Sequence, residues 1–261
     1  MHDWIRKLFV ERSALFLKLL NHRWSRTEEL VDGIVKVLQD VGITSGNLLD
    51  LCCGNGRVSI NMAKRGFRAV GIDISEAFLE DAREKAREHG VSTAVRFFEG
   101  DVRNLGQVIG RVPQPFDVVV SAWTSIGYYS QDDDLNIFRQ ARELAREGAI
   151  LFVAETMHSE FLSLKFAPNS CMELDDIILM ENRKYDPTTS QISTTWTFYR
   201  KRGMDLEFMD TAEFELHIYS SSELCSLLRK ASWDPVASYT SLKTLQPINP
   251  LGHMNVVAKA Q

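Results

Sequence analysis

The segment best suited to chemistry is Leu48–Gly56, which reads LLDLCCGNG. An apolar run contains the acid Asp50, and a turn with glycines at positions 54 and 56 opens the next helical pattern. Glycine lets the backbone approach a ligand closely, and the first N–H groups of a helix face such a ligand. This arrangement indicates a nucleotide-like cofactor bound at the end of a strand.

The spacing argues against a nicotinamide dinucleotide. A dinucleotide-binding fingerprint requires G-x-G-x-x-G after a strand. Gly54 and Gly56 satisfy its first two glycines, but Ser59 stands where the third glycine or alanine belongs. Asp50 with the two glycines instead forms a D-x-x-x-G-x-G pattern. Another adenosine cofactor is therefore favoured, and a nicotinamide oxidoreductase is the least favoured enzyme class.

The D-x-x-x-G-x-G segment resembles the first motif of class I S-adenosylmethionine-dependent methyltransferases. In that family the first glycine of the loop often stands where this chain has Cys52, so the backbone has less freedom here. The resemblance implies S-adenosylmethionine as the cofactor and S-adenosylhomocysteine as the product. Later motifs agree with the family in order and spacing across about 75 residues.

The family resemblance implies roles for these later motifs. Asp73, at the end of the second expected strand, would accept hydrogen bonds from both ribose hydroxyls. Asp101 would meet the adenine amino group, Val102 its ring, and Trp123 the methionine end. The implied cofactor-binding residues are Asp50, Cys52, Cys53, Gly54, Gly56, Asp73, Ile74, Asp101, Val102, Ser121, Ala122 and Trp123.

Further segments resemble one branch of this family, the small-molecule methyltransferases that include N,N-dimethyltransferases of amino sugars. These segments are Arg26–Leu30, Ser125–Tyr128, Tyr185–Pro187, Thr195–Thr197 and Leu216–Tyr219. The resemblance implies methyl transfer to nitrogen or oxygen of a small-molecule acceptor by in-line displacement. It does not identify the acceptor. A macromolecular acceptor (tRNA or protein) and a non-catalytic S-adenosylmethionine-binding protein stay open as alternatives.

Three side chains are candidates for catalysis: Tyr128, Glu155 and His217. Positioning and exclusion of water can supply most of the barrier reduction, so a dedicated base is optional. Tyr128 follows a central strand at the edge where α/β sheets bind ligands. Glu155 ends another strand at that edge and could hold a cationic acceptor or pair at the surface. An ordinary polar role is favoured over a basic one for both His217 and His158.

The elements that position these residues alternate between short apolar runs and longer amphipathic patterns. This alternation predicts a doubly wound, mostly parallel α/β sheet of seven strands, Rossmann-like, with the last strand antiparallel as in the resembled family. Five strands are expected at 47–51, 67–73, 94–100, 116–121 and 149–155, and two more at 235–241 and 254–259. Capping signals stand at Ser130 and at Ser220 with Glu223.

Two pieces are not needed for that sheet. Residues 172–185, 191–201 and 206–219 predict an insertion of three antiparallel strands. An amphipathic helix at 3–20 could be a lid, a dimer element, a membrane-surface helix or simple packing. The expected domains are an N-terminal helix (1–24), a cofactor-binding core (25–165), the insertion as acceptor-side cover (166–219) and the closing elements of the core (220–261).

Composition excludes several other classes. The chain has 261 residues, a net charge of −5 and basic residues scattered along its length, which disfavours a nucleic-acid partner. No apolar run approaches the roughly twenty residues that span a bilayer. The four cysteines have no zinc-type spacing, so no metal is expected and the chain reads as cytoplasmic. A homodimer stays open.

Overall fold

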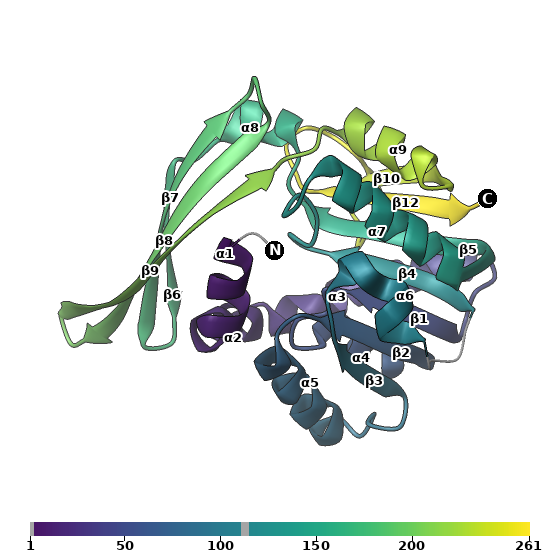
Figure 1. Ribbon diagram of the computed structural model, residues 1–261, viewed down its shortest axis with the longest axis horizontal. Coiled ribbons are helices and arrows are strands. Elements are labelled where there is room, and N and C mark those ends of the chain that lie inside the picture. The colour runs from purple at the N-terminus through teal and green to yellow at the C-terminus, as the bar shows by residue number, and fades with distance from the viewer. Residues whose placement is uncertain (1–2, 111–114) are drawn as a thin grey trace.

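The computed structural model describes residues 3–110 and 115–261, which form two sheets with helices around and between them (Figure 1). The larger sheet has the order β11-β10-β12-β5-β4-β1-β2-β3. Its strands are β1 (Gly46–Leu51), β2 (Phe67–Asp73), β3 (Val95–Glu99), β4 (Phe116–Ala122), β5 (Ala145–Thr156), β10 (Trp233–Ser241), β11 (Gln246–Pro247) and β12 (Met254–Ala260).

The strand directions confirm a doubly wound, mostly parallel sheet. Strands β3, β2, β1, β4 and β5 pair in parallel, and the last strand, β12, is antiparallel to both β5 and β10. All seven expected strands are present. The two-residue β11 is an eighth strand that sequence patterning did not predict, because it is too short to carry any periodicity.

Helices cover both faces of this sheet. One hydrophobic cluster joins the sheet to α6, α7 and α9, and another joins it to α3, α4 and α5. The helices are α3 (Thr27–Asp40), α4 (Arg57–Ala63), α5 (Glu76–Glu88), α6 (Leu105–Ile109), α7 (Gln131–Leu144), α8 (Ser159–Lys165) and α9 (Ser221–Lys230), with short 3-10 turns η2 (Trp24–Arg26) and η3 (Val102–Asn104). Capping boxes at Ser130 and Ser220 begin α7 and α9, where the sequence predicts an N-cap and a capping box.

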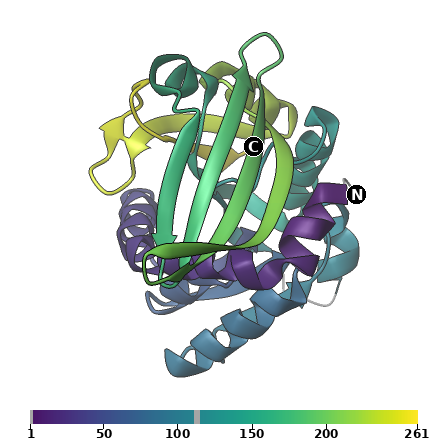
Figure 2. The same ribbon diagram turned by 90° about the vertical axis from the view of Figure 1, so that its left-hand side faces the viewer.

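The second sheet is antiparallel, as expected, but has four strands where three were predicted. They are β6 (Asn169–Leu174), β7 (Ile177–Asp186), β8 (Gln191–Arg202) and β9 (Asp205–His217), seen face on in Figure 2. The expected strand at 172–185 is divided by a two-residue turn, because Leu174 pairs directly with Ile177. Asp175 there has φ +55°, a conformation that aspartate tolerates in tight hairpins.

The N-terminal segment is helical but not one continuous helix. It consists of α1 (Asp3–Arg6), a π-helical turn η1 (Lys7–Glu11) and α2 (Ser13–His22); residues 1 and 2 of the predicted segment lie outside the described residues. At the interruption the Arg12 N–H donates to the Lys7 carbonyl at 3.0 Å, a bond one residue longer than an α-helical one. The Arg12 side chain there pairs with Asp210 of β9 at 2.6 Å.

The N-terminal helices lie between the two sheets (Figure 1). A third hydrophobic cluster contains Phe9, Phe16 and Leu20 of this segment with Trp196 and Phe214 of the second sheet. The carboxyl ends of β2, β4 and β5 meet the same cluster through Ile74, Trp123 and Met157. No helix of the described chain is both long and apolar enough to cross a lipid bilayer.

Candidate active site

Three neighbouring strands of the larger sheet carry an unfavourable backbone conformation near their carboxyl ends. Cys52 after β1, Trp123 after β4 and Glu155 near the end of β5 have φ values of +53°, +66° and +54°. Such values cost roughly 1–3 kcal/mol in non-glycine residues and persist where the surrounding structure enforces them, commonly at functional sites. The strain therefore marks this edge of the sheet as a candidate site.

Asp50 connects the first strand to the helix that follows it. Its carboxylate accepts hydrogen bonds from the Ser59 backbone N–H at 3.1 Å and from the Ser59 hydroxyl at 2.7 Å. Burial raises the pKa of Asp50 to about 6, against the lowering effect of these bonds. Ser59, which breaks the dinucleotide pattern, thus acts as the partner of the acid that opens the motif.

Asp73 holds the glycine loop from the end of β2. One carboxylate oxygen accepts from the Gly54 N–H at 2.8 Å, and the other accepts from the Ser75 N–H at 3.0 Å. Burial raises the pKa of Asp73 to about 6, although both bonds favour the ionised form. A carboxylate offers about four lone-pair sites, so each oxygen keeps capacity for a ligand hydroxyl.

Asp101 lies after β3 in a different electrostatic environment. Partial burial acts to raise its pKa, but hydrogen bonds from Arg103 outweigh burial and lower it. The Arg103 Nη2 lies 2.6 Å from the carboxylate, and its guanidinium lies 4.3 Å from the ring centroid of Tyr129. Asp101 is therefore an ionised acceptor at neutral pH.

These acids border a cavity at the carboxyl edge of the sheet, with a volume of about 70 Å³. The predicted cofactor residues that line it are Asp50, Cys52, Cys53, Gly54, Asp73, Ile74, Asp101, Val102, Ala122 and Trp123. Ile5, Phe9, Phe16 and Leu20 cover it from the N-terminal helices.

Two predicted cofactor residues do not line this cavity. Gly56 has φ +72°, and a Cβ there would lie 2.7 Å from the ring of Phe97, so glycine is required for packing. Ser121 is buried within β4, where it pairs with Leu51 on one side and Val153 on the other.

A second cavity of about 200 Å³ adjoins the first. It lies among the N-terminal helices, the ends of β4 and β5 and the second sheet, and its aromatic lining includes Trp4 and Trp196. Phe9, Phe16, Trp123 and Tyr128 border both cavities. These four rings therefore form a shared wall between the first cavity, which the predicted cofactor residues line, and the second cavity, which other side chains line.

The structure brings two of the three catalytic candidates together. Tyr128 belongs to the shared wall, where its hydroxyl lies 2.9 Å from the Thr124 hydroxyl. Burial raises the pKa of Tyr128, so its side chain stays a neutral phenol. Glu155 lines the second cavity and lies between two guanidinium groups, 3.2 Å from Arg23 and 3.8 Å from Arg57. Arg57 faces the first cavity and Arg23 the second.

The third candidate, His217, lines neither cavity. Its ring Nε2 lies 3.1 Å from the Gln131 side chain, and burial lowers its pKa. Its backbone is more directly connected to the site, because the His217 N–H donates to the Gly127 carbonyl at 2.9 Å. His217 therefore supports the loop that carries Tyr128, and its side chain stands apart.

Sequence reasoning missed several polar residues of the second cavity: Arg23, Glu181, Arg183 and His253. His253 precedes β12, and burial lowers its pKa, which keeps the imidazole neutral at pH 7. No local motif marks it. It reaches the site only because β12 lies beside β5, so that the loop before β12 meets the end of β5.

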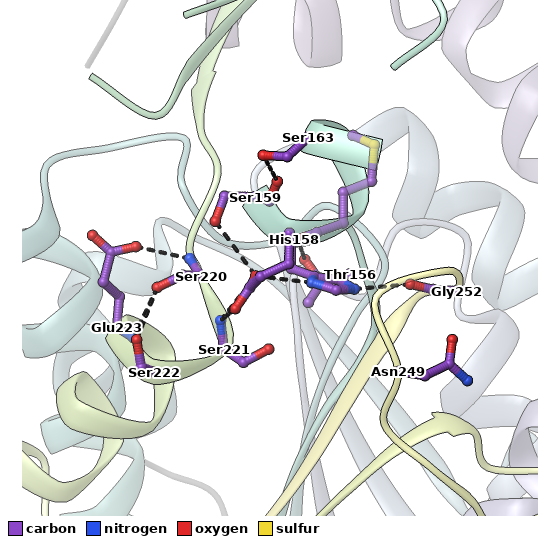
Figure 3. Close-up of polar contacts among 12 residues, drawn as sticks. Thr156, His158, Ser159, Ser163, Ser220, Ser221, Ser222, Glu223, Asn249 and Gly252 are labelled. Carbon is purple, nitrogen blue, oxygen red and sulfur yellow. Dashed lines mark hydrogen bonds and ion pairs between the residues drawn. The ribbon is translucent and has the colours of Figure 1, made fainter. Parts of the chain in front are cut away.

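His158 fixes that loop from outside the cavity. Its Nε2 lies 2.9 Å from the Gly252 carbonyl, and its Nδ1 lies 2.9 Å from the Glu160 carboxylate. Glu160 in turn accepts from the Ser221 N–H at the start of α9 at 3.0 Å. Figure 3 shows His158 between the Gly252 loop and Ser221. The described residues contain no group of three or more His, Cys, Asp or Glu that could hold a metal ion.

Comparison with known families and sequences agrees with this geometry. Residues 48–148 match the family model described as a methyltransferase domain. YqeM of Bacillus subtilis (strain 168), a protein whose name describes it as a methyltransferase, is 35% identical over 127 residues. These residues cover 48% of this chain and 47% of YqeM. The chain spans about half the length of the curated relatives it matches first.

Solved structures resemble almost the whole chain. An S-adenosylmethionine-dependent methyltransferase from Clostridium acetobutylicum ATCC 824 has a TM-score of 0.75 at 17% identity and covers 89% of this chain and 91% of its own. The sugar N-methyltransferase KedS8 from Streptoalloteichus sp ATCC 53650 has a TM-score of 0.71 at 15% identity, and the match covers 95% of this chain and 92% of KedS8. At these identities the similarity establishes a shared fold, including the second sheet within the matched length.

Proposed function

We propose that this protein transfers a methyl group from S-adenosylmethionine to nitrogen or oxygen of a small-molecule acceptor, since residues 48–148 match the family model described as a methyltransferase domain. The observation that carries the proposal is the pair of adjoining cavities. One is lined by the cofactor motif and the other by aromatic and charged side chains, with Trp123 and Tyr128 in their common wall. In-line transfer requires the two ligands to meet directly, and the boundary between these cavities is where the methyl group and the acceptor atom would meet.

The residues of the first cavity suit the proposed cofactor. Asp73 would bind the ribose hydroxyls through the free lone pairs of its carboxylate, and Asp101 with Val102 would bind the adenine. Arg57 is buried and faces this cavity, so it would bind the cofactor's carboxylate. Ile5, Phe9, Phe16 and Leu20 of the N-terminal helices line this cavity, so these helices would act as a lid over the bound cofactor.

When bound, S-adenosylmethionine supplies an electrophilic methyl group for in-line displacement. The protein's contribution is to orient the acceptor and exclude water, which the apolar side chains of the N-terminal helices do at the shared wall. The neutral imidazole of His253 would accept the proton that the acceptor releases. Glu155, already between two arginines, would orient Arg23 and Arg57.

Nitrogen is the favoured accepting atom. Trp4, Trp123, Trp196 and Tyr128 line the second cavity, and aromatic faces attract a cationic amine or its methylated product. The fold shared with a sugar N-methyltransferase supports the same choice. An amine also needs only to lose a proton, whereas a hydroxyl depends more on a general base.

Two measurements test the proposal in order. Calorimetric titration with S-adenosylmethionine and S-adenosylhomocysteine, with NADH as the control, should show micromolar binding of the two sulfur compounds and none of NADH. Release of S-adenosylhomocysteine is then followed across a panel of small amines, amino sugars and alcohols. Binding without turnover across that panel, together with a stable protein partner, would favour a non-catalytic role instead.

A further inference from the structure

One guanidinium group in the second cavity has no partner among the described residues, that of Arg183. It lies on β7, where alternate side chains face opposite sides of the sheet. Leu179, Glu181 and Arg183 face the interior, while Lys184 is exposed. The Nε of Arg183 is shielded from solvent and has no hydrogen-bond partner within residues 3–110 and 115–261.

The other charged groups of this cavity are already engaged. Arg23 pairs with Glu155 at 3.2 Å. Glu181 accepts from the Trp196 indole N–H at 2.7 Å and from the Ser170 hydroxyl. Neither carboxylate pairs with Arg183. A shielded N–H donor without an acceptor is unfavourable, so the position of the Arg183 Nε beside a cavity points to an acceptor that arrives with a ligand.

Cationic side chains elsewhere on the second sheet have their own carboxylates. Lys201 pairs with Glu173 at 2.7 Å. The Arg200 Nε is shielded and has no hydrogen-bond partner among the described residues, but it lies 3.7 Å from the Asp176 carboxylate, which balances its charge. Arg183 differs from them in facing the cavity. Thr194, directly opposite Arg183 in the pairing of β7 with β8, also lines the cavity and adds a hydroxyl beside the guanidinium.

We propose that the acceptor carries an acidic group, a carboxylate or a phosphate, and that Arg183 binds it. This inference rests on the proposed methyl transfer and defines its substrate class. A guanidinium presents a planar fork of N–H donors that matches both anions. The Nε of Arg23 is likewise shielded and without a partner among the described residues, and it provides a second donor to the same cavity.

The proposed acceptor therefore has two functional groups that bind at different places in the second cavity. Its amine lies at the shared wall of Trp123 and Tyr128, where the methyl group arrives, and its acidic group lies at the second sheet beside Arg183 and Thr194. The acceptor is therefore an amino acid-like or phosphorylated amine. Arg183 is a specificity-determining residue that contacts the acceptor away from the reacting atoms.

Binding can be measured without knowing the natural acceptor, because Trp4, Trp123 and Trp196 line the cavity and report on it by fluorescence. Protein saturated with S-adenosylhomocysteine is titrated with 4-(aminomethyl)benzoate, with 2-aminoethyl phosphate and with benzylamine, which has no acid. At least one acidic probe should bind about tenfold more tightly than benzylamine. The two acidic probes distinguish a carboxylate site from a phosphate site.

The variants locate the effect. Arg183→Gln should remove the preference for the acidic probe, and Arg183→Lys should retain part of it, because lysine keeps the charge without the fork. Lys184→Gln is the matched control: it removes the same charge from the neighbouring residue on the opposite side of the strand and should change nothing. Calorimetry with S-adenosylhomocysteine verifies that each variant is folded.

The proposal is overturned if neither acidic probe binds more tightly than benzylamine, or if Arg183→Gln binds the acidic probe as the wild type does. Failure of the proposed function gives a different pattern. In that case S-adenosylhomocysteine does not bind, whereas acidic probes still bind in a manner that depends on Arg183, which leaves an anion site without methyl transfer.

Discussion

Replacing Asp73 with asparagine should separate cofactor binding from the integrity of the loop. The carboxylate accepts the Gly54 and Ser75 N–H groups, so Asp73→Ala would leave two buried donors without acceptors and confuse unfolding with lost binding. Asp73→Asn keeps the shape and one acceptor oxygen. It removes the negative charge and replaces the other oxygen with an NH2 donor, which can accept neither from a ribose hydroxyl nor from the backbone N–H that it faces. One buried N–H therefore loses its acceptor, against two in Asp73→Ala, so the loop is weakened less.

The expected loss is that of a hydrogen bond to a charged group, about 1.5–3 kcal/mol, or roughly 10- to 150-fold in the dissociation constant of S-adenosylhomocysteine. Calorimetry at pH 7.5 measures the affinity, and urea unfolding of the same samples verifies that the variant is folded. Glu80→Gln, an exposed acid on α5, is the control and should bind as the wild type does. A folded Asp73→Asn protein that binds within twofold of the wild type would refute the placement of the ribose at Asp73.

The same site and its supports lead to four further predictions. Burial raises the pKa of Asp73 to about 6, so wild-type affinity for S-adenosylhomocysteine should fall below pH 6 as this carboxylate protonates, and the pH profile of Asp73→Asn should lack that contribution. Asp134, at the start of α7, accepts hydrogen bonds from the Gly127 N–H at 3.0 Å and from the Tyr219 hydroxyl at 2.7 Å, and burial raises its pKa to about 7. The folded state therefore retains a proton that the unfolded state has lost above pH 4. The unfolding free energy of the wild type relative to Asp134→Asn should therefore decrease from pH 4 to pH 7 in urea titrations, and an increase would contradict the assignment. Cys52 has φ +53°, which glycine adopts more readily than alanine, so the unfolding free energy of Cys52→Gly should be about 1 kcal/mol larger than that of Cys52→Ala. Equal unfolding free energies would show that the loop relaxes. His158→Phe should lower the unfolding free energy by about 1–3 kcal/mol, because it removes the hydrogen bonds of the imidazole to the Gly252 carbonyl and to the Glu160 carboxylate. Ser163→Ala on exposed α8 should have little effect.

Elements set by contacts within a few residues could be predicted from the sequence. The N-cap at Ser130 and the capping box at Ser220 occur as expected, and Asp133 completes a capping box at Ser130 that sequence patterning did not predict. The acids Asp50, Asp73 and Asp101 stand at strand ends, and parallel strands bring their carboxyl ends to one edge, so all three line one cavity. The prediction of three strands in the insertion was wrong, because a two-residue turn at Asp175 interrupts an otherwise continuous strand pattern.

The acceptor side of the site depended on contacts that no local pattern records. His253, Glu155 and Arg23 line one cavity although they come from the loop before β12, from β5 and from the segment after α2. His217 was a catalytic candidate beside Glu155 in the sequence, yet its ring faces Gln131 outside both cavities.

The sequence by itself determined the alternation of strands and helices and the cofactor motif, because hydrophobic period, turn glycines and caps act over a few residues. The tertiary structure alone decided which long-range neighbours meet: that the N-terminal helices cover the cofactor cavity, that β12 brings His253 to Glu155, and that Arg183 faces inward without a carboxylate. Those contacts depend on how two separate sheets pack around one another, and a one-residue change of strand register would turn Arg183 outward and Lys184 inward.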